Sequence, residues 1–180
     1  MLEAVENAAP ELRAPPAEWA RADPLGFVEK DHAVQRGLAD LLEALADSLP
    51  DAARPARAAL CAGMLRDYAA RGASVEGRGL FAALERRLEG DDATRAAIAL
   101  ARREHALAGG QAIELAEELD SLCALGRPND PECLGFMLRG FFEGLRRRLD
   151  WVDAAILVRA RHALARGDLA ALGARLEAML

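Results

Sequence analysis

Residues 23–49 read DPLGFVEKDHAVQRGLADLLEALADSL, and this stretch decides the fold class. It opens with Asp23-Pro24, an acid that can cap a helix followed by proline at the first helical position, where its missing N–H costs nothing. Apolar residues then recur with a 3.6-residue period, and polar residues lie opposite. The stripe consists of Val34, Leu38, Leu41, Leu42, Leu45 and Leu49. We therefore predict an amphipathic helix from 24 to about 48, ended by Pro50.

Three further stretches have the same period and are expected to form long helices. Their approximate ranges are 51–88, 91–125 and 130–165, and a last short helix is expected at 169–179. Asp130-Pro131 repeats the capping pair of the first helix, and Gly126 supplies a helix stop. Because the linkers are short, neighbouring helices should be antiparallel. The sequence thus predicts an all-α antiparallel four-helix bundle over 23–180, with a short extra C-terminal helix.

Two segments depart from this regular pattern. Residues 1–22 contain three prolines and are expected to form a loosely ordered arm, with Trp19 as its contact to the bundle. The second helix contains Gly72, Gly77 and Gly79, and each glycine costs about 1 kcal/mol relative to alanine inside a helix. We therefore predict a kink or an interruption of the second helix between Gly72 and Gly79.

Composition and charge argue against nucleic-acid binding. The 180 residues carry a formal net charge of -6, which argues against a nucleic-acid-binding protein. The short basic run 146–148 is flanked by acids and is expected to be a solvated helix face. Basic residues are nearly all arginine, as coding bias toward GC-rich codons, typical of many bacteria, would produce.

The cysteines and the hydropathy pattern predict a cytoplasmic protein. Cys61, Cys123 and Cys133 have no CxxC spacing, so we expect buried thiols in a reducing compartment. Residues 1–23 lack the apolar core of a signal peptide, and no apolar run approaches membrane-spanning length.

Four short motifs lie in order along the four expected helices. They are Asp31-His32, then 76–85 (EGRGLFAALE), then Glu104-His105, and finally 148–158 (RLDWVDAAILV). Together, over about 23–165, they resemble the hemerythrin-like (HHE cation-binding) family. The resemblance implies a four-helix bundle whose core holds a non-haem di-iron centre, with metal ligands contributed by each helix.

Carried over by position, the resemblance implies an incomplete ligand set. His32, Glu76 and His105 stand where the family has ligands, and the acid of the fourth helix is either Val152 or Asp153. The missing histidines are those whose places are taken by Gly72 and Arg148, and Ala101 holds the place of an optional second histidine on the third helix. Arg148 is expected either to reach Glu76 or to turn out to solvent.

This ligand set leads to two functional hypotheses. One is a regulatory or partner-binding bundle, not an enzyme, with a degenerate site at His32, Glu76, His105 and Asp153 and without di-iron oxygen chemistry. The alternative is a divergent cation-binding protein that holds a single iron or zinc ion through His32, Glu76 and His105. Either form would act without nucleic acid or membrane, and an unknown protein partner is possible.

Without the family resemblance, the residues alone give weaker support for a metal site. His32 lies well off the centre of the apolar stripe, so periodicity alone places it at the surface or its boundary. His105 is as readily a partly exposed histidine as a ligand, and Asp153 as readily a solvated acid. His162 reads as a surface residue, and Glu76 reads as a solvated acid at a helix break. The three phenylalanines of the fourth helix are expected in the core: Phe136, Phe141 and Phe142. The single Glu29-x-x-His32 match to ferritin-like bundles lacks the second copy that such sites need.

Overall fold

The computed structural model describes residues 12–13, 15–49 and 55–179. Most of the predicted arm and the first residues expected for the second helix, 51–54, therefore lie outside the described residues. The helices are α2 (Trp19–Ala22), α3 (Pro24–Ala46), α4 (Pro55–Gly72), η2 (Ala73–Phe81), α5 (Ala82–Glu85), α6 (Asp92–Leu125), α7 (Pro131–Trp151), η3 (Val152–Leu157), α8 (Val158–Ala163) and α9 (Arg166–Met179).

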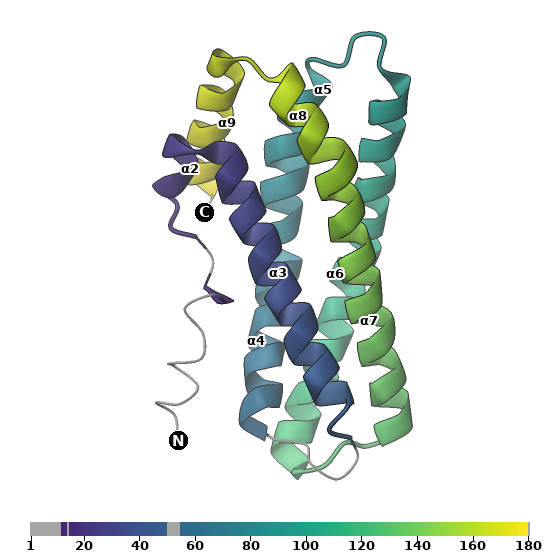
Figure 1. The fold of residues 1–180 in the computed structure, drawn as a ribbon. Helices are drawn as coiled ribbons and strands as arrows, with labels where there is room; N and C mark the ends of the chain where they lie inside the picture. The colour runs from purple at the N-terminus through teal and green to yellow at the C-terminus, as the bar shows by residue number, and fades with distance from the viewer. Residues whose placement is uncertain (1–11, 14, 50–54, 180) are drawn as a thin grey trace.

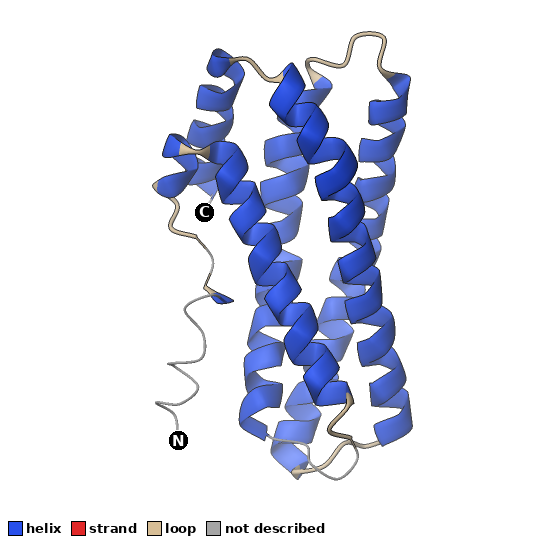
Figure 2. Cartoon of the chain, viewed as in Figure 1, coloured by secondary structure: helices blue, strands red, loops and turns tan. Residues whose placement is uncertain are grey.

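Four long helical rods form an antiparallel bundle, as predicted (Figure 1). The rods are α3, then α4–η2–α5, then α6, and finally α7–η3–α8, where η denotes a π-helical segment. Loops join one rod to the next, and the described part of the chain contains no strand (Figure 2). The most extensive helix packing is that of α4 against α6 and of α3 against α7, and the short α9 packs against α2, η2 and α3.

The predicted caps fix the ends of the long helices. The side chains of Asp23, Asp91 and Asp130 each accept a hydrogen bond from a backbone N–H three residues on, at 2.9–3.0 Å. These bonds satisfy donors that would otherwise have no partner within the helix. Gly126 ends α6 with φ of 72°, a left-handed conformation that favours glycine.

The α-helix of the second rod is interrupted where the glycines predicted it, but the chain does not break. Residues Ala73–Phe81 form a π-helical segment that continues directly from α4 into α5. The wider π turn accommodates the glycine-rich stretch while helical hydrogen bonding continues. A second π segment, η3, lies in the fourth rod, and no glycine or proline in its sequence signals it.

The core consists of two apolar clusters, one at each end of the bundle. One gathers the second half of α3, α4, the second half of α6 and α7; the other gathers the start of α3, η2, α5, the start of α6, η3, α8 and α9. Near the boundary between the two clusters, each rod carries a buried polar side chain: His32, Glu76, His105 and Arg148. These four side chains are therefore all interior.

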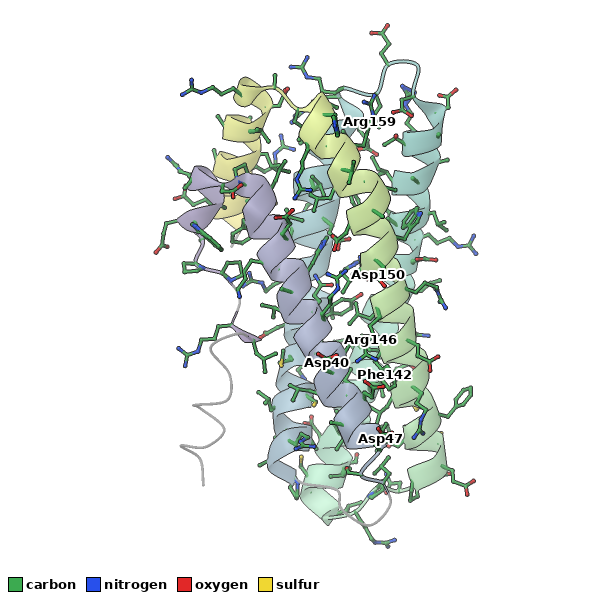
Figure 3. All side chains as sticks on the ribbon, in the orientation of Figure 1. Asp40, Asp47, Phe142, Arg146, Asp150 and Arg159 are labelled. Carbon is green, nitrogen blue, oxygen red and sulfur yellow. The ribbon has the colours of Figure 1, made fainter. Side chains whose placement is uncertain are left out.

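Ion pairs join α3 to α7 along the surface, as Figure 3 shows. Arg146 Nη2 donates to Asp40 Oδ1 at 2.5 Å and to Glu43 Oε2 at 2.7 Å, and its guanidinium lies 5.2 Å from the centre of the Phe142 ring. The expectation of a solvated face for 146–148 was therefore wrong, since Arg146 is half-buried, Arg148 is buried and only Arg147 is exposed.

Two further expectations about burial were wrong in part. Phe141 and Phe142 are buried, but the side chain of Phe136 is 80% exposed because it lies on the opposite side of α7 from Leu134 and Leu138. Of the cysteines, Cys61 alone is buried; Cys123 is half-buried and Cys133 is exposed. None of the helices in the described ranges has the length and apolarity needed to cross a membrane.

The contact between α9 and α2 depends on a glycine. A Cβ added at Gly173 would lie 2.6 Å from the backbone oxygen of Ala20, which no side-chain rotation can relieve. We expect Gly173→Ala to lower the free energy of unfolding by about 1–3 kcal/mol, the usual cost of overpacking, in urea denaturation. Gly167→Ala, in the same helix with nothing within 4 Å, is the control. Equal stability of the two variants would contradict the tight contact.

Candidate functional site

His32 is the centre of the buried polar layer. Its side chain is fully buried on α3, with Nδ1 2.5 Å from Asp153 Oδ1 and Nε2 3.1 Å from Glu76 Oε1. The periodicity-based placement of His32 at the surface was wrong. The buried stripe of α3 runs along the whole helix, but Asp31, His32 and Gln35 occupy its middle, so an apolar pattern cannot reveal it there.

Both carboxylates that contact His32 lie in π-helical segments. Glu76 belongs to η2 and Asp153 to η3. The two candidates for the acid of the fourth rod are distinguished by burial: Val152 is fully buried in an apolar cluster, whereas Asp153 contacts the histidine. A π turn carries an extra residue, so it changes the direction in which the following side chains point, and such turns are frequent at functional sites.

Arg148 reaches across the bundle to Glu76, which confirms one of the two positions expected for it. Arg148 Nη1 donates to Glu76 Oε1 and Oε2 at 2.8 and 2.7 Å, and both side chains are 3% exposed or less. Arg148 Nη2 donates to Gln35 Oε1 at 2.9 Å, and Gln35 Nε2 in turn donates to Asp31 Oδ2 at 2.8 Å. The guanidinium thus lies against both oxygens of the most buried carboxylate in the layer.

These contacts keep the central pairs ionised. Burial alone raises the pKa of Glu76, but the charge of Arg148 and the contact with His32 outweigh it and hold that pKa far below its usual range. Burial lowers the pKa of His32, yet Asp153 and Glu76 together raise it to about 9. Two cations therefore face two anions in the layer, which is the condition under which buried charges are tolerated.

His105 lies inside the bundle but outside this chain of contacts. Its ring is 5.2 Å from that of Tyr68, centre to centre, and neither of its nitrogens has a hydrogen-bond partner among the described residues. Burial lowers the pKa of His105, with Glu76 and Arg148 acting in opposite directions. His105 is therefore a neutral imidazole at neutral pH. His162, as expected, is exposed.

Sequence reasoning missed three members of the layer: Asp31, Gln35 and Tyr68. Two of them carry a signal of helical spacing. Tyr68 precedes Glu76 by two i,i+4 steps, with Gly72 between them, and Gln35 follows His32 by three residues, so each shares a helix face with a predicted site residue. Tyr68 is 5% exposed and packs edge-on against Phe141, with ring centres 5.6 Å apart.

The donor set does not fit a di-iron centre. Within the described ranges, no three His, Cys, Asp or Glu side chains are grouped closely enough to hold a metal ion. His32 contacts Glu76 through Nε2 and Asp153 through Nδ1, so the two carboxylates lie at different edges of the ring. His105 is hydrogen-bonded to none of these three side chains, and Glu76 already binds a guanidinium through both oxygens. A dication at Glu76 would lie beside the fixed positive charge of Arg148.

Comparison with known proteins supports the order of motifs along the rods. The sequence matches the family model described as the hemerythrin HHE cation binding domain over residues 23–160. This match begins one residue before α3, ends within α8 and includes all the residues of the polar layer. No curated protein and no solved structure matches the chain. The chain belongs to the hemerythrin HHE cation-binding domain family.

Proposed function

We propose that this protein is a hemerythrin-like bundle with a degenerate metal site, which has a regulatory or partner-binding role and is neither an enzyme nor a di-iron oxygen carrier. One observation carries the proposal: the Arg148 guanidinium contacts both oxygens of Glu76 at 2.7 and 2.8 Å. The positive charge that the family takes from a metal ion is supplied here by the chain itself.

The chemistry of arginine makes this replacement difficult to reverse. A guanidinium remains charged at any physiological pH and donates in a fixed planar geometry, so it cannot become a metal ligand. Binding of a dication at Glu76 would require Arg148 to leave a site where it is 3% exposed and also bonded to Gln35. Moving an unpaired charge through an apolar core costs several kcal/mol.

A second candidate function rests on His105. Its two ring nitrogens are buried and have no partner in the described ranges, which is unusual for a polar group in a protein core. A single iron or zinc ion held by His32, Glu76 and His105 would give one of those nitrogens a ligand role. This alternative requires Arg148 to move away from Glu76.

Other features are consistent with a partner-binding role in a reducing compartment. Phe136 exposes 80% of its surface on α7, and aromatic side chains are enriched at protein interfaces. The cysteines Cys61, Cys123 and Cys133 are free thiols, as expected in the cytoplasm.

Metal analysis of tag-free protein tests the proposal. We expect the wild type to contain no stoichiometric iron, and Gly72→His with Arg148→His to raise iron uptake, because two imidazoles are restored at family ligand positions. The matched control is Gly63→His with Arg147→His, which adds the same two histidines at exposed positions on the same two rods.

Each outcome distinguishes the candidates. Two irons per wild-type chain, with oxo-bridge absorption in the near ultraviolet, would refute the degenerate site. One iron or zinc ion per wild-type chain, lost in His105→Gln, would establish the single-metal alternative. Equal iron uptake by the restored and control variants would show that the polar layer does not bind metal even when the two histidines are restored.

A further inference from the structure

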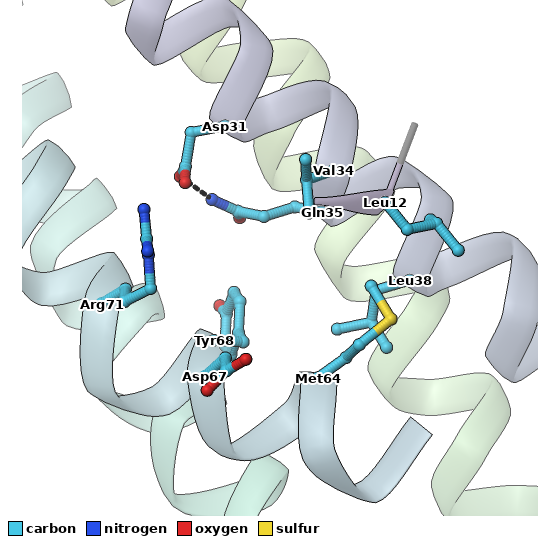
Figure 4. A pocket seen from close by; sticks show the side chains of 9 residues that line it. All are labelled: Leu12, Asp31, Val34, Gln35, Leu38, Met64, Asp67, Tyr68 and Arg71. Atoms are coloured by element: carbon cyan, nitrogen blue, oxygen red, sulfur yellow. Dashed lines mark hydrogen bonds between the residues drawn. The ribbon is translucent and has the colours of Figure 1, made fainter. Parts of the chain in front are cut away.

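A small cavity lies between α3 and α4. Its volume is about 70 Å³. Figure 4 shows side chains of Asp31, Val34, Gln35 and Leu38 reaching it from α3, with Met64, Asp67, Tyr68 and Arg71 from α4, and Leu12 beside them. Neither Glu76 nor Arg148 lines this cavity, so it is a separate feature of the polar layer.

Within the part of the chain that the structure describes, two hydrogen-bond donors at this cavity lack an acceptor. The Tyr68 hydroxyl is buried on a side chain that is 5% exposed, and it lies near Arg148, which can donate to it but cannot accept its proton. Arg71 Nη2 is a buried atom of a half-buried side chain. Buried polar groups in proteins are nearly always bonded, and an unbonded one costs about 1–3 kcal/mol. Asp31, which also lines the cavity, receives the Gln35 amide at 2.8 Å and is bonded to neither of these donors. The missing component is therefore an acceptor.

The opposite wall of the cavity is apolar. Val34, Leu38 and Met64 form it. Small-molecule sites typically combine such a wall with a few convergent polar groups. The volume suits a few water molecules or a ligand of a few heavy atoms.

We propose that this cavity binds a short-chain monocarboxylate. The carboxylate accepts from Arg71 Nη2 and from the Tyr68 hydroxyl, in the charge-assisted pairing that arginine makes with carboxylates, and the alkyl group packs on Leu38 and Met64. Of the two acids that line the cavity, Asp31 is bonded to Gln35 and Asp67 is exposed to solvent. The inference goes beyond the proposed function, because it requires neither the presence nor the absence of a metal ion.

Leu12 covers this site through a contact that only glycine allows. A Cβ added at Gly37 of α3 would lie 2.3 Å from Leu12 Cδ2. Leu12 therefore rests directly on the α3 backbone at the margin of the cavity. Gly37→Ala should displace Leu12 without altering Tyr68 or Arg71, and should speed ligand exchange.

Tyr68 is the only tyrosine in the chain, which makes it a single spectroscopic reporter of the site. We would label tyrosine with ¹³C at the hydroxyl-bearing carbon and titrate the full-length protein with propionate, followed by NMR. The expected result is one saturable shift. Propylamine, which lacks an acceptor, should produce none, and propionamide should bind more weakly than propionate because it carries no charge.

Matched variants test which residues contact the bound propionate. Arg71→Met should weaken propionate binding by at least about tenfold, corresponding to one charge-assisted hydrogen bond. Arg66→Met, which removes an exposed arginine of the same helix, should leave the affinity unchanged. Met64→Phe, which fills the cavity without touching a charge, should abolish binding. Gly37→Ala should raise the exchange rate, whereas Gly63→Ala, with open space around it, should not.

Three outcomes would overturn the proposal: no saturable shift with propionate, an unchanged affinity in Arg71→Met, or a stronger response to propylamine than to propionate. Circular dichroism of each variant shows whether a lost response reflects unfolding, and Met64→Phe tests the cavity if Arg71→Met does not fold. Iron or zinc uptake by the wild type would contradict the proposed function but would leave this titration unaffected, so the two inferences fail independently.

Discussion

Replacement of Arg148 by methionine should lower the free energy of unfolding by about 3–5 kcal/mol, the range found when one partner of a buried ion pair is removed. Methionine keeps much of the apolar stem but leaves Glu76, which is 1% exposed, without its cation. Gln35 Oε1 would lose its donor at the same time. Urea denaturation at neutral pH, with the slope compared between variants, measures the loss.

A double-mutant cycle measures the interaction free energy between Arg148 and Glu76 separately from their contacts with other residues. Glu76→Gln combined with Arg148→Met should be considerably more stable than the sum of the two single losses, because neither charge is then left alone. Arg147→Met is the matched control, since this neighbouring arginine is exposed and should change stability by less than about 0.5 kcal/mol. Additive losses in the cycle would show that Arg148 and Glu76 do not depend on each other.

Stability should fall as the pH rises from about 6.5 to 9, by about 3 kcal/mol, because of His32 alone. The pKa of His32 is raised from 6.5 to about 9 in the folded protein by Asp153 and Glu76. The folded state therefore holds a proton that the unfolded chain releases. The resulting stabilisation is complete below pH 6.5 and is lost as the pH rises through 9.

The carboxylates limit the stability of the protein at acidic pH. The pKa values of Glu76 and Asp153 are lowered in the folded state, so their contribution is present above pH 4.5 and is lost in acid. Urea denaturation from pH 4 to 9.5 should therefore give a maximum between about 5 and 6.5. His32→Gln should remove the alkaline decline, whereas His162→Gln, at an exposed position, should keep it. An identical alkaline decline in wild type and His32→Gln would contradict the raised pKa.

Local sequence signals determined the fold and its helix boundaries. Asp23-Pro24, Asp130-Pro131 and Gly126 define helix ends through hydrogen bonds made within a few residues, so no distant contact is needed to recognise them. The glycines at 72–79 marked the interruption of the second rod for the same local reason, although they did not specify a π-helical form. The order of four motifs indicated the family, and the family match confirms it.

Tertiary structure alone decided which polar residues face inward and how they pair. His32 lies off the apolar stripe of its own helix, so its burial depends on Glu76 and Asp153 from two other rods. The π turn at Val152–Leu157, in which Asp153 contacts His32, has no signal in the local sequence. Whether Val152 or Asp153 is the acid position of the fourth rod could therefore be decided only from the packing of the rods. From the sequence, Arg148 could either contact Glu76 or point to solvent, and in the packed bundle it contacts Glu76. A charge enclosed in a four-helix core is stable only when an opposite charge is close to it, and here that charge comes from a distant segment of the chain.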